Sequence, residues 1–191
     1  MGKVVVSQFI TVDGVVEDPG GSEKFERGGW AFEFDRGEEG NKFKLDEVMA
    51  AGALLLGRTT YEGFAAAWPS RKDDIGFADK FNNMPKYVVS STLSNPEWNN
   101  SHVLGDDLAA EVNRLKGEVD GDLLVNGSVQ LCHALGEAGL VDEWRLMVFP
   151  VVLGKGKRLF GDEAAKSKLA LSEARPVGDE GVVVLTYAPT A

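Results

Sequence analysis

The chain has almost no cysteine and almost no histidine. Cys132 is the single cysteine among 191 residues, so one chain can form neither an intrachain disulfide nor a cysteine-based metal site. His102 and His133 stand alone in the sequence, and we expect both to be structural histidines. These shortages predict a protein without a metal centre that is compatible with a reducing compartment.

The chain is also short of basic residues and of long apolar runs. Twenty Lys and Arg face 30 Asp and Glu, giving a formal net charge of −10, the wrong sign for a nucleic-acid partner. The amino-terminal segment lacks the apolar run of a signal peptide or membrane helix, and Val6 stands where a myristoylation signal requires Ser or Thr. We therefore expect a cytoplasmic protein whose partners are neither nucleic acid nor membrane.

The remaining composition is that of an ordinary globular domain. Hydrophobic residues make up 43% of the chain and charged residues 26%, which leaves enough apolar material for a sizeable core. At this length a single hydrophobic core is the default, and no repeat or linker divides the sequence. We expect one domain over residues 1–191.

Hydrophobic patterning predicts strands that alternate with helices for most of the chain. Expected strands are 3–11, 53–56, 86–90, 102–104, 122–125, 143–152, 169–177 and 182–187, the last two forming a hairpin. Expected helices are 42–51, one opened by a Thr59–Glu62 capping box, 77–82, one capped by Asp106, and 129–138; residues 15–40 form a long loop. This order predicts an α/β fold with a mainly parallel twisted sheet, helices on both faces and an antiparallel carboxyl-terminal edge.

Three polar turns follow three of the expected strands directly. In open α/β sheets ligands lie at the carboxyl ends of the strands, where turn amides and helix N-termini converge. Glycine permits a close approach of the backbone, arginine offers a fork of donors to phosphate, and hydroxyls add donors without charge. The three turns, each of which could alternatively be a simple helix start or turn, are Gly57-Arg58-Thr59-Thr60, Ser90-Ser91-Thr92 and Asn126-Gly127-Ser128-Val129.

The run Leu54–Glu62 resembles the cofactor-binding strand, turn and helix of dihydrofolate reductases. Over almost the whole chain the sequence is similar to the reductase domain of the bifunctional riboflavin-biosynthesis deaminase–reductase, most closely to stand-alone bacterial members of that superfamily. Shared features are the Asp13-Gly14 turn after the first strand and the glycine-rich loop that follows Pro150. No deaminase zinc motif is present, so the resemblance covers the reductase half alone.

The resemblance implies a dihydrofolate reductase-like three-layer α/β/α fold and an NADPH site. It places the adenosine phosphate end of NADPH against Gly57, Arg58, Thr59 and the 90–92 segment. It places the pyrophosphate against a second group, Asn126, Gly127, Ser128 and Val129. Dihydrofolate reductases usually carry paired glycines before the last cofactor helix, whereas here Asn126 precedes Gly127. The resemblance therefore does not predict the backbone conformation at Asn126-Gly127.

Candidate catalytic groups are few, as hydride transfer asks the protein for positioning and electrostatics. In dihydrofolate reductases a carboxylate of the first helix helps to protonate the substrate, and Asp46 and Glu47 are the acids of the corresponding helix here. We predict Asp46 as the acid that faces substrate, although acids in such a helix are often solvated dipole partners. Asp13 is the second candidate, for a hydroxyl of substrate or ribose, against a pure turn role.

Two further groups of residues leave alternatives open. Lys155, Lys157 and Arg158 either receive a phosphorylated substrate or are simply exposed. The aromatic residues of the long loop form either a homodimer interface or a substrate lid: Trp30, Phe32 and Phe34.

The sequence predicts an NADPH-dependent reductase of a small heterocyclic or carbonyl substrate, acting as a homodimer. The resemblance favours 5-amino-6-(5-phosphoribosylamino)uracil reductase activity. Dihydrofolate reduction is the alternative enzyme, because the cofactor half matches dihydrofolate reductases better than the substrate half does. A non-catalytic nucleotide-binding protein with the same fold is the alternative of a different class.

Overall fold

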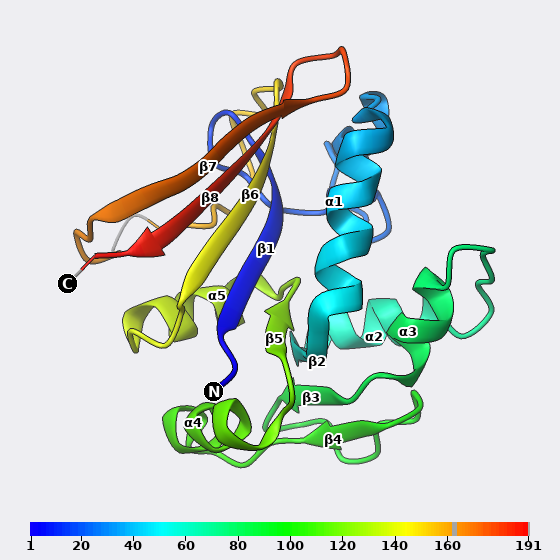
Figure 1. Ribbon diagram of the computed structural model, residues 1–191, viewed down its shortest axis with the longest axis vertical. Coiled ribbons are helices and arrows are strands. Elements are labelled where there is room, and N and C mark those ends of the chain that lie inside the picture. Colours follow the sequence, from blue (N-terminus) through cyan, green and yellow to red (C-terminus); the bar gives the residue numbers. More distant parts are fainter. Residues whose placement is uncertain (162–163, 191) are drawn as a thin grey trace.

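The computed structural model describes residues 1–161 and 164–190, which form one eight-stranded sheet with helices on both faces (Figure 1). Along the sheet the strands lie in the order β4-β3-β2-β5-β1-β6-β8-β7. The strands are β1 (Val4–Thr11), β2 (Ala51–Gly57), β3 (Lys86–Val89), β4 (Ser101–Val103), β5 (Asp122–Val125), β6 (Glu143–Phe149), β7 (Leu169–Val177) and β8 (Val182–Pro189). The helices are α1 (Gly37–Ala50), α2 (Arg58–Ala67), α3 (Phe77–Asn83), α4 (Leu108–Glu118) and α5 (Val129–Glu137), with a 3-10 turn η1 (Trp30–Glu33).

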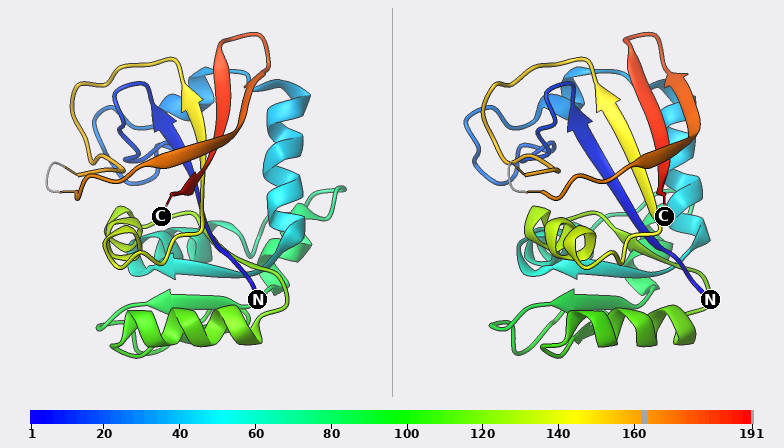
Figure 2. Two further views of the ribbon diagram at one scale, coloured as in Figure 1. Left: turned by 60° about the vertical axis from the view of Figure 1, so that its left-hand side comes forward. Right: turned by 90° about the vertical axis from the view of Figure 1, so that its left-hand side faces the viewer.

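The sheet is parallel from β4 to β6 and antiparallel at its carboxyl-terminal edge. β1 lies between β5 and β6 and is parallel to both. β8 pairs antiparallel with β6 and with β7. Figure 2 shows how strongly the sheet twists, so that β3 and β4 cross the direction of β7 and β8. The predicted architecture, including the closing hairpin, is confirmed.

Alternation along the central strands sends side chains to two separate cores. Val4, Val6 and Leu55 pack with the helices α4 and α5 on one face. Val5 and Leu54 pack with α1, α2 and α3 on the other face. Because β1, β2 and β5 are buried on both faces, their sequences are mainly apolar, with Ser7 and Gln8 as buried polar residues of β1. Helices therefore cover both faces, as predicted.

Several predicted boundaries and caps are wrong. α1 begins at Gly37, five residues before the predicted start, inside the segment predicted to be a loop. Thr59 is the second residue of α2 rather than its cap; Gly57 holds the cap position and no side chain caps the helix. At α4 the cap is Asp107, whose carboxylate accepts from the Ala110 amide at 3.0 Å, instead of Asp106. β6 ends at Phe149, three residues before the predicted end.

Candidate active site

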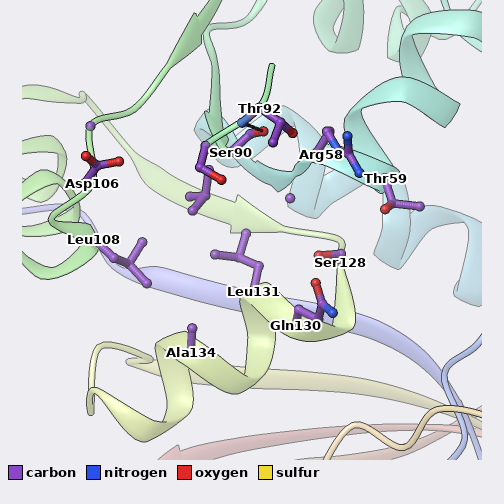
Figure 3. Close-up of a pocket in the computed structure, with 14 residues that line it drawn as sticks. Arg58, Thr59, Ser90, Thr92, Asp106, Leu108, Ser128, Gln130, Leu131 and Ala134 are labelled. Carbon is purple, nitrogen blue, oxygen red and sulfur yellow. Dashed lines mark hydrogen bonds between the residues drawn. The ribbon is translucent and has the colours of Figure 1, made fainter. Parts of the chain in front are cut away.

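The three predicted turns meet at a cleft of about 480 Å³ at the carboxyl ends of β2, β3 and β5. Seven of the ten predicted cofactor residues line it: Gly57, Arg58, Thr59, Ser90, Ser91, Thr92 and Ser128. Figure 3 shows Arg58, Thr59 and Ser128 together at one end of the cleft, with Ser90 and Thr92 along one side. Parallel pairing of β2 with β3 and β5 brings these turns to the same edge of the sheet.

Gly57 is required by the close approach of two of these turns. Its amide donates to the Gly127 carbonyl at 3.2 Å. A Cβ at position 57 would lie 2.2 Å from Ser128 Oγ, closer than any real contact. Only glycine therefore lets the start of α2 lie against the start of α5.

The starts of α2 and α5 both open onto the cleft without a side-chain cap. Gly57 precedes α2 and Ser128 precedes α5, and neither helix start has a side-chain hydrogen bond to its first amides. Uncapped N-terminal amides and the helix dipole together favour an anion. Two such helix starts at one cleft suit a ligand that carries more than one phosphate.

The cleft offers one guanidinium and several hydroxyls. The Arg58 side chain is half exposed, and its ionic partner among the described residues is Glu62 at 4.0 Å, so the guanidinium is available to a ligand. Ser90 Oγ accepts from the amides of Thr92 (3.2 Å) and Leu93 (3.0 Å), which fixes the turn. Ser90 thus has the structural turn role as well, while the exposed Ser91 and Thr92 side chains stay free for a ligand.

The far end of the cleft is built from residues that were not predicted. Leu108, Leu131 and Ala134 form an apolar surface, and Asp106 lies at the rim (Figure 3). Leu131 packs in the core beneath α5, and nothing in the sequence signals its contact with a ligand cleft. Asp106 is misread because two consecutive aspartates precede α4, and only the second one caps it.

The other three predicted cofactor residues lie behind the cleft rather than in its wall. Asn126 donates from Nδ2 to the Ser7 carbonyl at 3.2 Å. Gly127 is buried with φ +124°, and a Cβ there would meet Thr60 Oγ1 at 2.7 Å; the Gly127–Ser128 peptide bond is cis. Val129 packs against the core under α5. Contact of Asn126, Gly127 and Val129 with the cofactor stays a prediction.

A second polar cluster lies one strand further along, where α1 crosses β1. Glu47 is buried, and its carboxylate accepts from Ser7 Oγ at 2.8 and 3.0 Å. Lys44 donates from Nζ to Ser7 Oγ at 3.0 Å and to Glu47 Oε1. Asp46, the predicted acid, instead points outward on α1 with its side chain 59% exposed, and accepts from Lys42. Of the acids on α1, the buried one is Glu47.

This cluster continues onto the Phe9 ring. Lys44 Nζ and the Arg36 guanidinium each lie 5.1 Å from the centre of that ring. Arg36 donates from Nε to Asn41 Oδ1 at 2.7 Å, and burial lowers the pKa of its guanidinium, an effect that Glu47 opposes. Two cations therefore share one half-buried aromatic ring in a chain that is strongly acidic overall.

Asp13 joins two loops. Its carboxylate accepts from Thr11 Oγ1 at 2.6 Å and from the amides of Gly154 (2.8 Å) and Leu153 (3.2 Å). Burial works against ionisation, yet these hydrogen bonds hold the pKa of Asp13 below its usual value. The Asp13 carboxylate oxygens thus accept hydrogen bonds from the protein's own loops. This matches a structural role in the turn more closely than contact with a substrate hydroxyl.

The basic residues of the 154–158 loop are engaged with acids. Lys155 pairs with Glu26 at 2.6 Å and Lys157 with Glu17 at 2.6 Å. Arg158 donates to the Asp13 carbonyl. These cations tie the loop to the long 15–36 segment, so the interpretation as a free phosphate site loses support. His133 donates from Nε2 to the Arg158 carbonyl at 3.0 Å, a structural role as predicted.

The aromatic residues of the long loop separate into two groups. Trp30 is 1% exposed, its Nε1 donates to the Glu17 carbonyl at 3.0 Å, and its ring packs edge-on against Phe149. Phe34 also packs against Phe149, whereas Phe32 is 75% exposed. Trp30 is therefore a core residue, and its predicted place in a lid or dimer interface is wrong.

The order of the strands, the two helical layers and the cleft at the carboxyl edge define a dihydrofolate reductase-type α/β fold. A dihydrofolate reductase from Enterococcus faecalis complexed with NADP(H) superposes on this chain with a TM-score of 0.60 at 14% identity, covering 100% of this chain and 98% of that one. A putative riboflavin biosynthesis protein from Shewanella sp. PV-4 gives a TM-score of 0.78 at 18% identity, with both chains covered completely.

Residues 2–183 match the family model of the RibD C-terminal domain, and the chain belongs to that family. The protein YyaP of Bacillus subtilis is 28% identical over 189 residues, 97% of this chain and 94% of YyaP. The predicted family is thereby confirmed, and with it the class of protein, an oxidoreductase of the riboflavin-biosynthesis reductase type. None of the helices described between residues 1 and 190 combines the length and apolar character needed to cross a membrane.

Proposed function

We propose that this protein is an NADPH-dependent reductase of a small heterocyclic or carbonyl substrate, most like 5-amino-6-(5-phosphoribosylamino)uracil reductase. The observation that carries the proposal is the convergence of the three polar turns on one cleft. Family membership supports the riboflavin-type substrate, and the Enterococcus faecalis neighbour, which has NADP(H) bound, supports the cofactor.

The donor set of the cleft fits a phosphorylated dinucleotide. Uncapped amides at the starts of α2 and α5 offer donors to a pyrophosphate. Arg58 and the hydroxyls of Ser91 and Thr92 offer donors to a further phosphate, and the apolar end suits an adenine ring. Bound there, NADPH would supply the hydride, while the protein binds, orients and shields the reacting groups.

Binding and turnover are tested separately. Titration of the protein with NADPH, followed by the quenching of tryptophan fluorescence, measures cofactor affinity without any substrate. NADPH oxidation at 340 nm is then followed with the phosphoribosylamino-uracil, with dihydrofolate and with a panel of pterins and pyrimidines. Oxidation with the phosphoribosylamino-uracil is the expected result.

The two alternatives give different outcomes in the same measurements. Oxidation with dihydrofolate alone would identify a dihydrofolate reductase. Tight NADPH binding with no oxidation across the panel would favour a non-catalytic nucleotide-binding protein. Failure to bind NADPH at millimolar concentration would overturn the proposal itself.

A further inference from the structure

In the cluster of Ser7, Lys44 and Glu47, a buried carboxylate holds a partly buried ammonium group near the protein surface. Glu47 lies at the back, with its side chain 1% exposed, and Lys44 lies in front of it, with its side chain 16% exposed. An ammonium has three N–H donors. Two point to Ser7 Oγ and Glu47 Oε1, and among the described residues no acceptor takes the third. One donor of Lys44 is therefore available on the side of the Phe9 ring.

The cluster is connected to the predicted cofactor turn by a single residue. Ser7 receives Lys44 on its hydroxyl and Asn126 on its carbonyl, at 3.0 and 3.2 Å. Asn126 directly precedes Gly127 and Ser128, whose turn contacts Gly57 at the cleft. Lys44 thus lies beside the turn, on the α1 face of the sheet, which is separate from the wall of the cleft.

Most other charges on this face are already paired. Ser7 lies beside Arg145 in the sheet register, and Arg145 pairs with Glu143 at 2.6 Å. On β7, Arg175 pairs with Glu173 at 3.0 Å. Among the described residues Arg36 has no carboxylate within 4.0 Å. Lys44, Arg36 and Glu47 therefore leave one net positive charge next to an aromatic ring, which suits a planar, oxygen-bearing ligand of negative or growing negative charge.

We propose that Lys44, oriented by Ser7 and Glu47, contacts the substrate heteroatom that gains negative charge during reduction, and that Phe9 and Arg36 complete the surface on which the substrate lies. This inference rests on the proposed function. When the carbon of a C=X group receives hydride from the reduced nicotinamide, the π electrons move to X and the cofactor is left oxidised. The Lys44 ammonium stabilises X⁻, which afterwards takes a proton from water.

Binding of a probe tests the contact without any turnover. Barbiturate is a planar pyrimidine that is an anion at neutral pH, and calorimetry measures its affinity for the protein with and without NADP⁺. We expect Lys44→Met to weaken barbiturate at least tenfold. Lys42→Met is the matched control, since Lys42 lies on the same helix but is exposed and pairs with Asp46, and we expect no change. Equal affinity in Lys44→Met, or no binding by the native protein at millimolar concentration, would overturn the inference.

The positioning role of Glu47 predicts a split between binding and rate. Glu47→Gln keeps the size of the side chain and removes its charge, so barbiturate should bind as tightly as before or more tightly. The kcat with the phosphoribosylamino-uracil should nevertheless fall at least tenfold, because the ammonium loses its orientation. Glu39→Gln is the control, since Glu39 is an exposed acid of the same helix, and we expect an unchanged kcat. If the Lys44–Glu47 ion pair is purely structural, the folded fraction of Glu47→Gln should instead keep the native barbiturate affinity and the native kcat.

Chemical rescue separates a missing ammonium from a damaged fold. Lys44→Met and Lys44→Cys should lower kcat by about 10²–10³, the usual loss for one stabilising donor. Treating Lys44→Cys with 2-bromoethylamine rebuilds an ammonium of nearly the original length. Cys132 should be spared, because burial raises the pKa of its thiol to about 12. A kcat that stays low after complete alkylation would contradict the proposed contact. NADPH affinity is measured in the same experiments. A native protein that does not bind NADPH would overturn the proposed function rather than this inference.

Discussion

Arg58 is the residue that we expect to distinguish NADPH from NADH. Its guanidinium is half exposed at the cleft, and its ionic partner within the described part of the chain is Glu62 at 4.0 Å. Arg58→Ala should weaken NADPH by about 10- to 100-fold, while NADH changes by less than about twofold, because only NADPH carries the extra phosphate.

Fluorescence titration of both cofactors measures this difference. Arg71→Ala is the control, since Arg71 stacks on Trp68 away from the cleft. Equal affinities for the two cofactors in the native protein would remove the role assigned to Arg58.

Gly127 carries both a conformational and a binding prediction. Its φ of +124° strains any L-residue, and a Cβ would press on Thr60 Oγ1. Gly127→Val should abolish NADPH binding and should also lower the free energy of unfolding by ~1–3 kcal/mol. Urea unfolding and cofactor titration below the melting temperature measure the two effects. A folded variant with native NADPH affinity would show that Gly127 is structural only.

Lys86 predicts a pH dependence of stability. It is fully buried on β3, donates from Nζ to the carbonyls of Asn82 and Asn99, and lies 4.2 Å from the centre of the Trp98 ring. Burial lowers the pKa of Lys86 to about 8, below its ordinary 10.5. Between these values the unfolded chain holds a proton that the folded chain has released, so stability rises with pH across this window.

The comparison with Lys86→Met isolates this contribution from other titrating groups. From pH 7 to pH 10 the free energy of unfolding of the native protein should rise by about 2 kcal/mol relative to the variant. Urea unfolding at each pH measures it. Parallel pH profiles for the two proteins would mean that the folded protein keeps Lys86 charged throughout, through its two carbonyl acceptors and the Trp98 ring.

At the level of the elements, α4 offers a test with a built-in control. Asp107 caps the helix through the Ala110 amide, whereas its neighbour Asp106 lines the cleft. Asp107→Ala should lower the free energy of unfolding by about 1 kcal/mol, the usual value of an N-cap, and Asp106→Ala should leave it unchanged. Thermal or urea unfolding of both variants decides between the observed cap and the one expected from sequence.

The sequence predicts the elements well where apolar patterning is strong and poorly where polar contacts decide. β5 begins and ends at the predicted residues, since an aliphatic run bounded by turns leaves little choice. β7 also matches its predicted bounds, although its sequence is mixed in polarity. The start of α1 is missed because residues 37–41 are Gly, Glu and Asn, which lack a helical apolar pattern, and Arg36 precedes them without capping. Tertiary packing against the β7–β8 turn places this helix start.

The site divides in the same way. Turns that directly follow parallel strands are predictable, because strand order brings their ends to one edge, and seven of the predicted residues indeed line one cleft. The choice between Asp46 and Glu47 is not predictable from the sequence. Adjacent helix positions differ by about 100° in direction, and only the packing of α1 on β1 decides which side chain is buried. Arg36 and Phe9 come together across 27 residues with no local signal.

At the level of the whole molecule, a homodimer remains a prediction. The apolar groups first considered for the interface are reduced to the exposed Phe32 and the half-buried Phe34, because Trp30 packs inside the protomer. Sedimentation velocity at micromolar concentration should show a dimer, and Phe32→Ser should weaken it if this residue lies between protomers. A monomeric native protein would leave Phe32 as a candidate for contact with the ligand.

The position of β1 in the sheet affects how the protein folds during its synthesis on the ribosome. β1 is the first strand to be synthesised, yet it lies between β5 and β6, and its pairing partners begin at Leu123 and Glu143. The emerging chain must keep an apolar strand unpaired until β5, more than 100 residues after β1 in the sequence, has been made. Such non-local pairing slows folding and exposes strand edges to aggregation. Nascent chains of this protein should therefore engage chaperones until residues 143–149 have left the exit tunnel, and should be released soon afterwards.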